Sequence, residues 1–182
     1  MNHCMLDLEA LDSNRSGVLV SIGAQMFDLG NMSLGDTYYC EISLSGMEDQ
    51  RLSGRTINLD TVCWWMQQSD SARKVFFPDP ERGKLGTRTA LKDFGRFLTS
   101  YSRPKVWGNG VDFDNVFLRD VYESYSIPCP WHYTQNRCYR TVKNMFPNVG
   151  LKREGAHHNA LDDATTQAKH LIEIWKYAKK QK

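Results

Sequence analysis

The stretch MLDLEAL, residues 5–11, combines the alternation of a β-strand with two acidic side chains on one side. Side chains i and i+2 of a strand share a face, so Asp7 and Glu9 project together while Leu6 and Leu8 point the other way. Neighbouring carboxylates repel each other, and each loses hydration wherever it is partly buried. A divalent cation would remove both costs because Mg²⁺ prefers hard oxygen ligands. An edge strand with one wet face would need no ligand.

The chain around this stretch begins β-rich and then turns helical. Apolar runs at residues 4–8, 18–27 and 37–42, separated by Gly, Asn and Ser, predict an antiparallel meander. Asp60 is the expected cap of a first helix, and Thr87 or Thr89 that of a second. The later predicted elements are a strand at 105–107 and helices at 114–125, 136–146 and 160–179. This order favours a single α/β domain, residues 1–182, with a sheet covered by helices.

Composition indicates a soluble chain and leaves its partners open. The net charge is only +2. Basic residues gather in the middle third, where they could hold a phosphate backbone or form a solvated face. They are Arg51, Arg55, Arg73, Lys74, Arg82, Lys84 and Arg88. Five scattered cysteines favour reduced thiols. The chain shows neither a leader sequence nor a membrane-spanning apolar run, so we expect a cytoplasmic protein with no membrane partner.

A second acidic position follows the predicted strand at 105–107, in the stretch VWGNGVDFDNVFL, residues 106–118. Asp114 there suits the N-cap of the next helix. Loops after strand ends are also where α/β sheets place their functional sites. Asp114 therefore has two interpretations, a helix cap or a side chain that reaches the space above Asp7 and Glu9.

The stretch GAHHNALDDA, residues 155–164, offers two histidine–aspartate pairs at one spacing, His157 with Asp162 and His158 with Asp163. At about 100° per residue, a helix that starts near residue 160 aligns a buried stripe. The stripe consists of Ala164, Ala168, Leu171, Trp175 and Ala178. Asp163 lies at the flank of this stripe and Asp162 on nearly the opposite side, facing solvent. Helix geometry thus favours Asp163 as the functional aspartate.

These motifs together resemble the DEDDh 3′→5′ exonucleases of the ribonuclease H-like superfamily. The matching positions are Asp7 and Glu9, Asp114 after Phe113, and His158 with Asp163, and the resemblance covers nearly the whole chain. It implies a mixed sheet, with an antiparallel first group of three strands followed by parallel strands, and helices on both faces. It also selects His158 as the partner of Asp163.

A narrower resemblance comes from TVCWWMQQSDSAR, residues 61–73, which is similar to the phage DNA exonuclease A branch. Of Trp64 and Trp65, one is expected to pack in the core and the other to stack on a terminal base or wedge the strand. The segment NRCYRT, residues 136–141, resembles a second segment of that branch and suggests Arg137 and Arg140 as substrate-binding residues. Cys138 stands there where the branch pattern has Asp.

The resemblance implies two-metal phosphodiester hydrolysis with Mg²⁺ or Mn²⁺. Asp7 would bridge two ions, Glu9 and Asp163 would complete the site of the attacking water, and Asp114 would support the second ion. His158 would accept the proton of that water, since imidazole titrates near neutrality. The products would be nucleoside 5′-monophosphates.

Three functions compete for this sequence. The phage-type match favours DNA 3′ ends as the substrate, and an exoribonuclease that trims RNA 3′ ends would use the same residues. A non-catalytic nucleic-acid-binding module is disfavoured because clustered carboxylates repel phosphate. The sequence predicts no particular oligomeric state.

Overall fold

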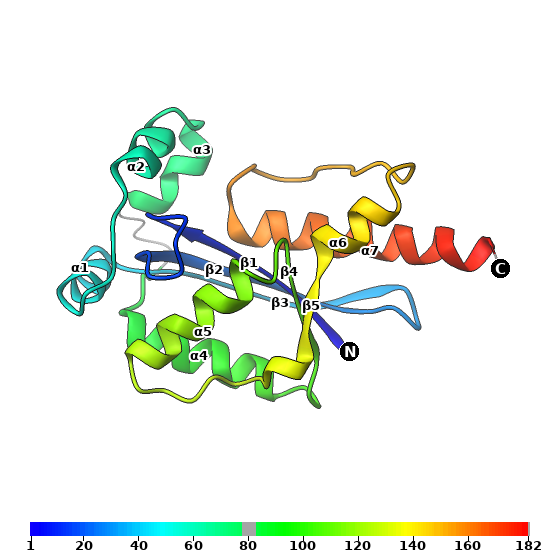
Figure 1. Ribbon diagram of the computed structural model, residues 1–182, viewed down its shortest axis with the longest axis horizontal. Helices are drawn as coiled ribbons and strands as arrows, with labels where there is room; N and C mark the ends of the chain where they lie inside the picture. The colour runs from blue at the N-terminus through cyan, green and yellow to red at the C-terminus, as the bar shows by residue number, and fades with distance from the viewer. Residues whose placement is uncertain (78–82, 182) are drawn as a thin grey trace.

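The computed structural model describes residues 1–77 and 83–181, which form a five-stranded sheet between two layers of helices (Figure 1). The strand order is β3-β2-β1-β4-β5. The strands are β1 His3–Ala10, β2 Leu19–Asp28, β3 Ser33–Glu41, β4 Lys105–Gly108 and β5 Asn136–Cys138. Within the described ranges, no helix has both the length and the apolar character to cross a membrane.

The directions of the strands confirm the predicted mixed sheet. β1 and β2 pair antiparallel, as do β2 and β3, whereas β4 runs parallel to β1 and β5 runs parallel to β4. The predicted helix at 136–146 is wrong at its start, because residues 136–138 pair with β4 as β5. Helix α6, Tyr139–Met145, begins only after this strand. Three residues are too few to show a strand periodicity in the sequence.

The alternation along β1 builds a different core on each face of the sheet. Leu6 and Leu8 join the larger core under α4, Thr87–Thr99, and α5, Asp114–Ser124. Met5 joins the second core under α7, Ala160–Lys180. Figure 1 shows α4 and α5 on one side of the strands and α6 and α7 on the other. Asp7 and Glu9 have the parity of Met5 and therefore face the α7 layer.

Four short helical segments pack near one end of the sheet. They are α1 Leu44–Leu52, α2 Leu59–Met66, α3 Asp70–Arg73 and the 3₁₀ turn η1 Lys74–Phe76. The predicted cap Asp60 is wrong, because the Asn58 side chain accepts from the Thr61 N–H and Asp60 lies in the first turn. Thr87 and Thr89 do not cap α4 either: Gly86 is its N-cap residue, and the Thr87 hydroxyl donates to the Gly46 carbonyl.

Helix α7 follows the predicted stripe over its first part. Ala164, Ala168 and Leu171 are fully buried against the sheet. Trp175, placed on the same stripe, is instead 40% exposed. The last turns of α7 extend past the strands (Figure 1), so the stripe has no sheet to cover at that end.

The basic residues of the middle third do not form one continuous face. Arg55 is buried and bonds Asp120 at 2.9 Å, so a solvated or phosphate-binding role is wrong for this residue. Three others form ion pairs, Arg51 with Glu48, Arg73 with Asp70 and Lys84 with Glu41. Arg82 lies outside the described residues.

Gly23 of β2 lets α7 approach the sheet directly above the acidic stretch. It is the cross-strand partner of Asp7. A Cβ atom built on Gly23 would lie 2.1 Å from the Ala160 carbonyl carbon and 2.3 Å from the Leu161 nitrogen. Both are main-chain atoms of the first turn of α7, and they cannot turn aside as a flexible side chain can. The missing side chain therefore sets how closely the start of α7 lies over β1.

Gly23→Ala is expected to lower the free energy of unfolding by about 3 kcal/mol or more, because the methyl group must push the helix off the sheet. Urea denaturation followed by circular dichroism measures this loss. The matched control is Gly95→Ala inside α4, where the new methyl would meet nothing closer than 3.7 Å. That variant should gain about 0.5–1 kcal/mol from helix propensity. A Gly23→Ala protein as stable as wild type would contradict the close approach.

Candidate active site

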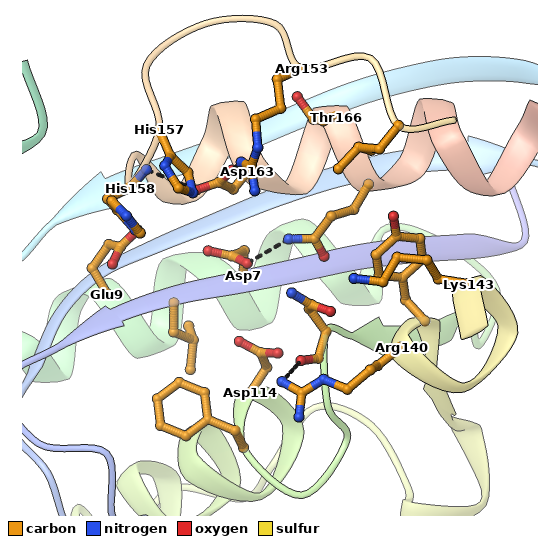
Figure 2. Close-up of a pocket in the computed structure, with 16 residues that line it drawn as sticks. Asp7, Glu9, Asp114, Arg140, Lys143, Arg153, His157, His158, Asp163 and Thr166 are labelled. Atoms are coloured by element: carbon orange, nitrogen blue, oxygen red, sulfur yellow. Dashed lines mark hydrogen bonds and ion pairs between the residues drawn. The ribbon is translucent and has the colours of Figure 1, made fainter. Parts of the chain in front are cut away.

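Four carboxylates from three elements meet beside the centre of β1 (Figure 2). Asp7 and Glu9 come from β1, Asp114 begins α5 just after β4, and Asp163 lies in the first turn of α7. Because β4 is parallel to β1, the loop after β4 delivers Asp114 to the side of Asp7. Carboxylate oxygens of Asp7, Glu9 and Asp163 lie within 4.8 Å of one another. The structure thus brings together all four acidic positions predicted from the sequence.

Asp114 is not the helix cap that its position also suggested. Phe113 is the N-cap residue of α5 and makes no side-chain capping bond, while Asp114 is 3% exposed. Its carboxyl faces the cluster from below in Figure 2. The burial is therefore explained by the site and not by the start of the helix.

Burial raises the pKa values of three of these acids, and repulsion by neighbouring carboxylates raises those of Asp7 and Glu9 further. Burial, followed by the charges of Asp114, Glu9 and Asp163, raises the pKa of Asp7 well above its ordinary value. Burial, followed by Asp163 and Asp114, raises the pKa of Glu9 to about 8. Burial raises the pKa of Asp114 to about 7, against the opposing effect of main-chain hydrogen bonds. Keeping all of these groups ionised at neutral pH therefore requires added positive charge.

Side-chain amide oxygens near the carboxylates provide further hydrogen-bond acceptors. Gln167 Nε2 donates to Asp7 Oδ1 at 2.8 Å, which leaves the buried Gln167 Oε1 without a hydrogen-bond partner among the described residues. Asn109 Oδ1, in the same pocket, is likewise buried without one in this part of the chain. Carboxylates and amide oxygens suit a hydrated Mg²⁺ or Mn²⁺, whose ligands are oxygens and whose bound waters need acceptors. The residues present therefore fit a divalent metal.

His158 and Asp163 are joined through the main chain. The His158 N–H donates to Asp163 Oδ2 at 2.9 Å, and His158 has a left-handed φ of 62°. Its ring lies in the pocket, stacked on His157 with centroids 3.7 Å apart and edge-on to Trp64 at 4.6 Å. Burial and the neighbouring His157 lower the pKa of His158 from its ordinary value. An imidazole with a lowered pKa is more fully neutral near pH 7 and can accept a proton.

The alternative histidine–aspartate pair is His157 with Asp162. Asp162 was expected to face solvent, but it is half-buried and accepts from the Ala156 N–H at 2.7 Å. It therefore holds the loop ahead of α7, and unlike Asp163 it is not one of the residues that line the pocket. His157 is exposed at the rim of the pocket.

The four predicted substrate-binding residues differ in their placement. Trp64 is 38% exposed beside His158 and lines a second pocket with Glu9 and Phe113. Trp65 is 4% exposed, and its indole donates to the Ala10 carbonyl, so it is chiefly a core residue. Arg140 lines the main pocket and donates to the Asn109 carbonyl.

Arg137 lies apart from these residues, on β5, where it donates to the carbonyls of Thr134 and Asn136. Its substrate contact stays a prediction. Cys138 does not replace an acid in the cluster: its Sγ caps α6 by accepting from the Thr141 N–H at 3.4 Å.

Gln167, Lys143 and Arg153 line the pocket but were not identified from the sequence. Gln167 lies one turn after Asp163 on α7, so the helical period contains a signal for it. Lys143 and Arg153 line the pocket from α6 and from the loop before α7. Neither has a distinctive spacing to the motifs, because the contacts that bring them in are tertiary.

Metal-free protein is expected to lose stability as pH rises from about 4.5 to about 8. Glu9 has a folded-state pKa of about 8 against 4.5 when unfolded, so the folded state retains its proton longer. Unfolding then becomes easier across this window, by a few kcal/mol in total for the coupled acids. Thermal unfolding in chelator at a series of pH values measures the decline. Added Mg²⁺ should flatten it, and a decline that Mg²⁺ leaves unchanged would contradict a metal role for the cluster.

The similarities to known proteins agree with this geometry. The sequence profile of a family described as the 3′-5′ exoribonuclease Rv2179c-like domain matches residues 2–175. The fold is similar to the nuclease domain of 3′hExo, described as a DEDDh family member bound to rAMP. The TM-score is 0.63 at 11% identity, over 96% of this chain and 91% of that one. No curated protein sequence matches the chain.

The fold is also similar to exonuclease I, with a TM-score of 0.61 at 13% identity, over 96% of this chain and 42% of that one. E. coli Exonuclease I in complex with a dT13 oligonucleotide gives a TM-score of 0.60 at 13% identity, over 94% of this chain and 40% of that one. This chain therefore spans less than half the length of exonuclease I. At such low identities the likeness establishes the ribonuclease H-like exonuclease fold.

Proposed function

The chain belongs to the 3′-5′ exoribonuclease Rv2179c-like domain family, and we propose that it is a metal-dependent enzyme that removes nucleoside 5′-monophosphates from RNA 3′ ends. The observation that carries this proposal is the convergence of four carboxylates beside His158. A module that only bound nucleic acid would gain nothing from buried acids that repel phosphate. The family description supports RNA as the substrate.

Asp7, Glu9 and Asp163 would hold one divalent ion, and Asp7 with Asp114 a second. Mg²⁺ or Mn²⁺, when bound, lowers the pKa of a coordinated water and offsets the negative charge that develops on the phosphate. Gln167 orients Asp7 through its hydrogen bond. Asp163 is oriented by the His158 main chain, which leaves the imidazole of His158 free for proton transfer.

His158 would accept the proton of the attacking water at a ring nitrogen, as its lowered pKa favours. Trp64 would stack on the terminal base from the second pocket, and Arg140 would contact a phosphate of the strand. The five free cysteines support work in a reducing compartment such as the cytoplasm.

DNA is the second candidate substrate. The TVCWWMQQSDSAR segment favours it through its resemblance to the phage DNA exonuclease A branch. None of the residues that we assign to metal binding or proton transfer discriminates a 2′-hydroxyl, so both substrates suit the same chemistry.

The test is a comparison of RNA and DNA oligonucleotides of the same sequence, labelled at the 5′ end and incubated with Mg²⁺ or Mn²⁺. We expect a stepwise ladder that shortens from the 3′ end, release of nucleoside 5′-monophosphates, and faster trimming of RNA. Faster trimming of DNA would reverse the substrate assignment. Absence of any ladder on either strand would overturn the enzyme proposal in favour of a binding module.

A further inference from the structure

Arg153 forms an ion pair with Asp163, one of the proposed metal ligands. Its Nη1 donates to Asp163 Oδ1 at 2.8 Å, while the other oxygen of Asp163 accepts from the His158 N–H. The side chain of Arg153 is 51% exposed and that of Asp163 is 14% exposed. The guanidinium thus reaches inward from the pocket rim to a largely buried carboxylate, as Figure 2 shows.

Arg153 and a metal ion would compete for the carboxylate of Asp163. Asp163 belongs to the group of three acids whose oxygens lie within 4.8 Å, where a divalent ion would sit. A guanidinium keeps its charge at all accessible pH values, so it cannot yield by losing a proton. Two cations near one carboxylate repel each other. Arg153 must therefore weaken its contact with Asp163 when a metal binds.

The loop that carries Arg153 can stay in place while the side chain moves. Next to Arg153, the Glu154 N–H donates to Thr166 Oγ1, and this hydroxyl also reaches the Glu154 carbonyl. The Glu154 side chain pairs with Lys169, and the Ala156 N–H bonds Asp162. All of these contacts anchor the loop to α7 without the guanidinium. Once it is released from Asp163, the guanidinium of Arg153 therefore stays close to the pocket.

The opposite wall of the pocket already has fixed cations. Arg140 donates to the Asn109 carbonyl, and Lys143 lies over the Tyr139 ring. Arg153 is the cation on the α7 side, within one hydrogen bond of a carboxylate that would bind metal. A phosphate held by that metal would come within reach of its remaining N–H donors, which suit phosphate oxygens.

We propose that Arg153 changes partner during the reaction: it holds Asp163 before the metal binds, and then donates to the phosphate of the 3′-terminal nucleotide. The inference rests on the proposed function, because it takes Asp163 as a metal ligand. It assigns Arg153 two roles with opposite effects on affinity. It opposes the metal when the site has no nucleotide, and it favours the nucleotide once the metal is present.

The test uses the full chain and two titrations by calorimetry. In the first, Mn²⁺ is added without nucleotide, and Arg153→Ala should bind it about two- to fivefold more tightly than wild type, the scale of a half-exposed ion pair. In the second, AMP is added to the Mn²⁺-loaded protein, and the variant should bind it about tenfold more weakly, whereas its affinity for adenosine should not change. Lys152→Ala, an exposed neighbour on the same loop, should match wild type in both titrations.

The outcomes separate the two proposals. Equal or weaker Mn²⁺ binding by Arg153→Ala would overturn the inference, since it would mean that Arg153 only orients Asp163. Unchanged affinity for AMP would also overturn it, by removing the phosphate contact. If wild type itself bound no Mn²⁺, the proposed function would fail first, and the inference with it.

Discussion

Asp7→Asn is expected to reduce hydrolysis of a nucleic-acid 3′ end by at least about a thousandfold, because the variant loses the charge at the centre of the proposed metal site. Asp7 is the acid that both proposed ions would share. Burial raises its pKa most, and the charges of Asp114, Glu9 and Asp163 raise it further, so Asp7 lies within the field of all three other acids.

The fold of this variant should remain intact and even gain stability. Asparagine keeps an Oδ1 that can accept from Gln167 Nε2, so the shape and the hydrogen bond are preserved. It also removes one of the mutually repelling charges from a buried cluster. Metal-free Asp7→Asn should therefore melt at a higher temperature than wild type near pH 8, although it is inactive.

Two measurements on the same preparation check this pair of expectations: the rate of 3′-end shortening and thermal unfolding in chelator. Asp112→Asn is the matched control, because Asp112 is an exposed acid in the loop between β4 and α5, two residues before Asp114, and its variant should keep nearly full activity. Substantial activity in Asp7→Asn would remove Asp7 from the metal site. A fall in melting temperature together with lost activity would indicate instead that Asp7 has a structural role.

His158→Asn is expected to lower turnover by about a hundred- to ten-thousandfold, the range of a lost general base. Asparagine is preferred over alanine here because the left-handed φ of 62° at His158 is one that asparagine adopts readily. The contact between this residue and Asp163 comes from the main-chain N–H and survives the substitution. Metal affinity should consequently stay within about twofold of wild type.

The companion variant His157→Asn separates the two histidines. His157 is exposed and stacks on His158. Its loss should lower turnover only a few-fold, because the His158 ring would be held less firmly. Single-turnover rates and Mn²⁺ titrations of both variants give the comparison. If His157→Asn were the inactive one, the catalytic pair would shift by one residue to the other register.

Periodicity predicted the parts of this molecule that depend on one element at a time. The alternation in MLDLEAL placed Asp7 and Glu9 on one face, and the helical period placed Asp163 rather than Asp162 beside the sheet; both placements match the structure. His158 was chosen by the family register, since the spacing alone fits His157 equally well.

Three of the differences from the sequence analysis come from contacts between distant segments. β5 exists because residues 136–138 pair with β4, and a strand so short has no periodicity of its own. Trp175 is exposed because the sheet ends before α7 does. Arg153 enters the site from a loop whose path is set by bonds to α7, which no local pattern encodes.

Because α7 lies so close to Gly23, a residue with no functional group of its own influences catalysis. The residue has no side chain and sits on a strand that contributes no acid to the cluster, yet the spacing between Asp7 and Asp163 depends on it. Random mutagenesis scored by nuclease activity should therefore recover position 23 alongside the acids themselves. Inactive proteins of that kind would retain every functional group and fail only in the distance between them. Gly23 therefore sets the spacing of the proposed metal site because it has no side chain.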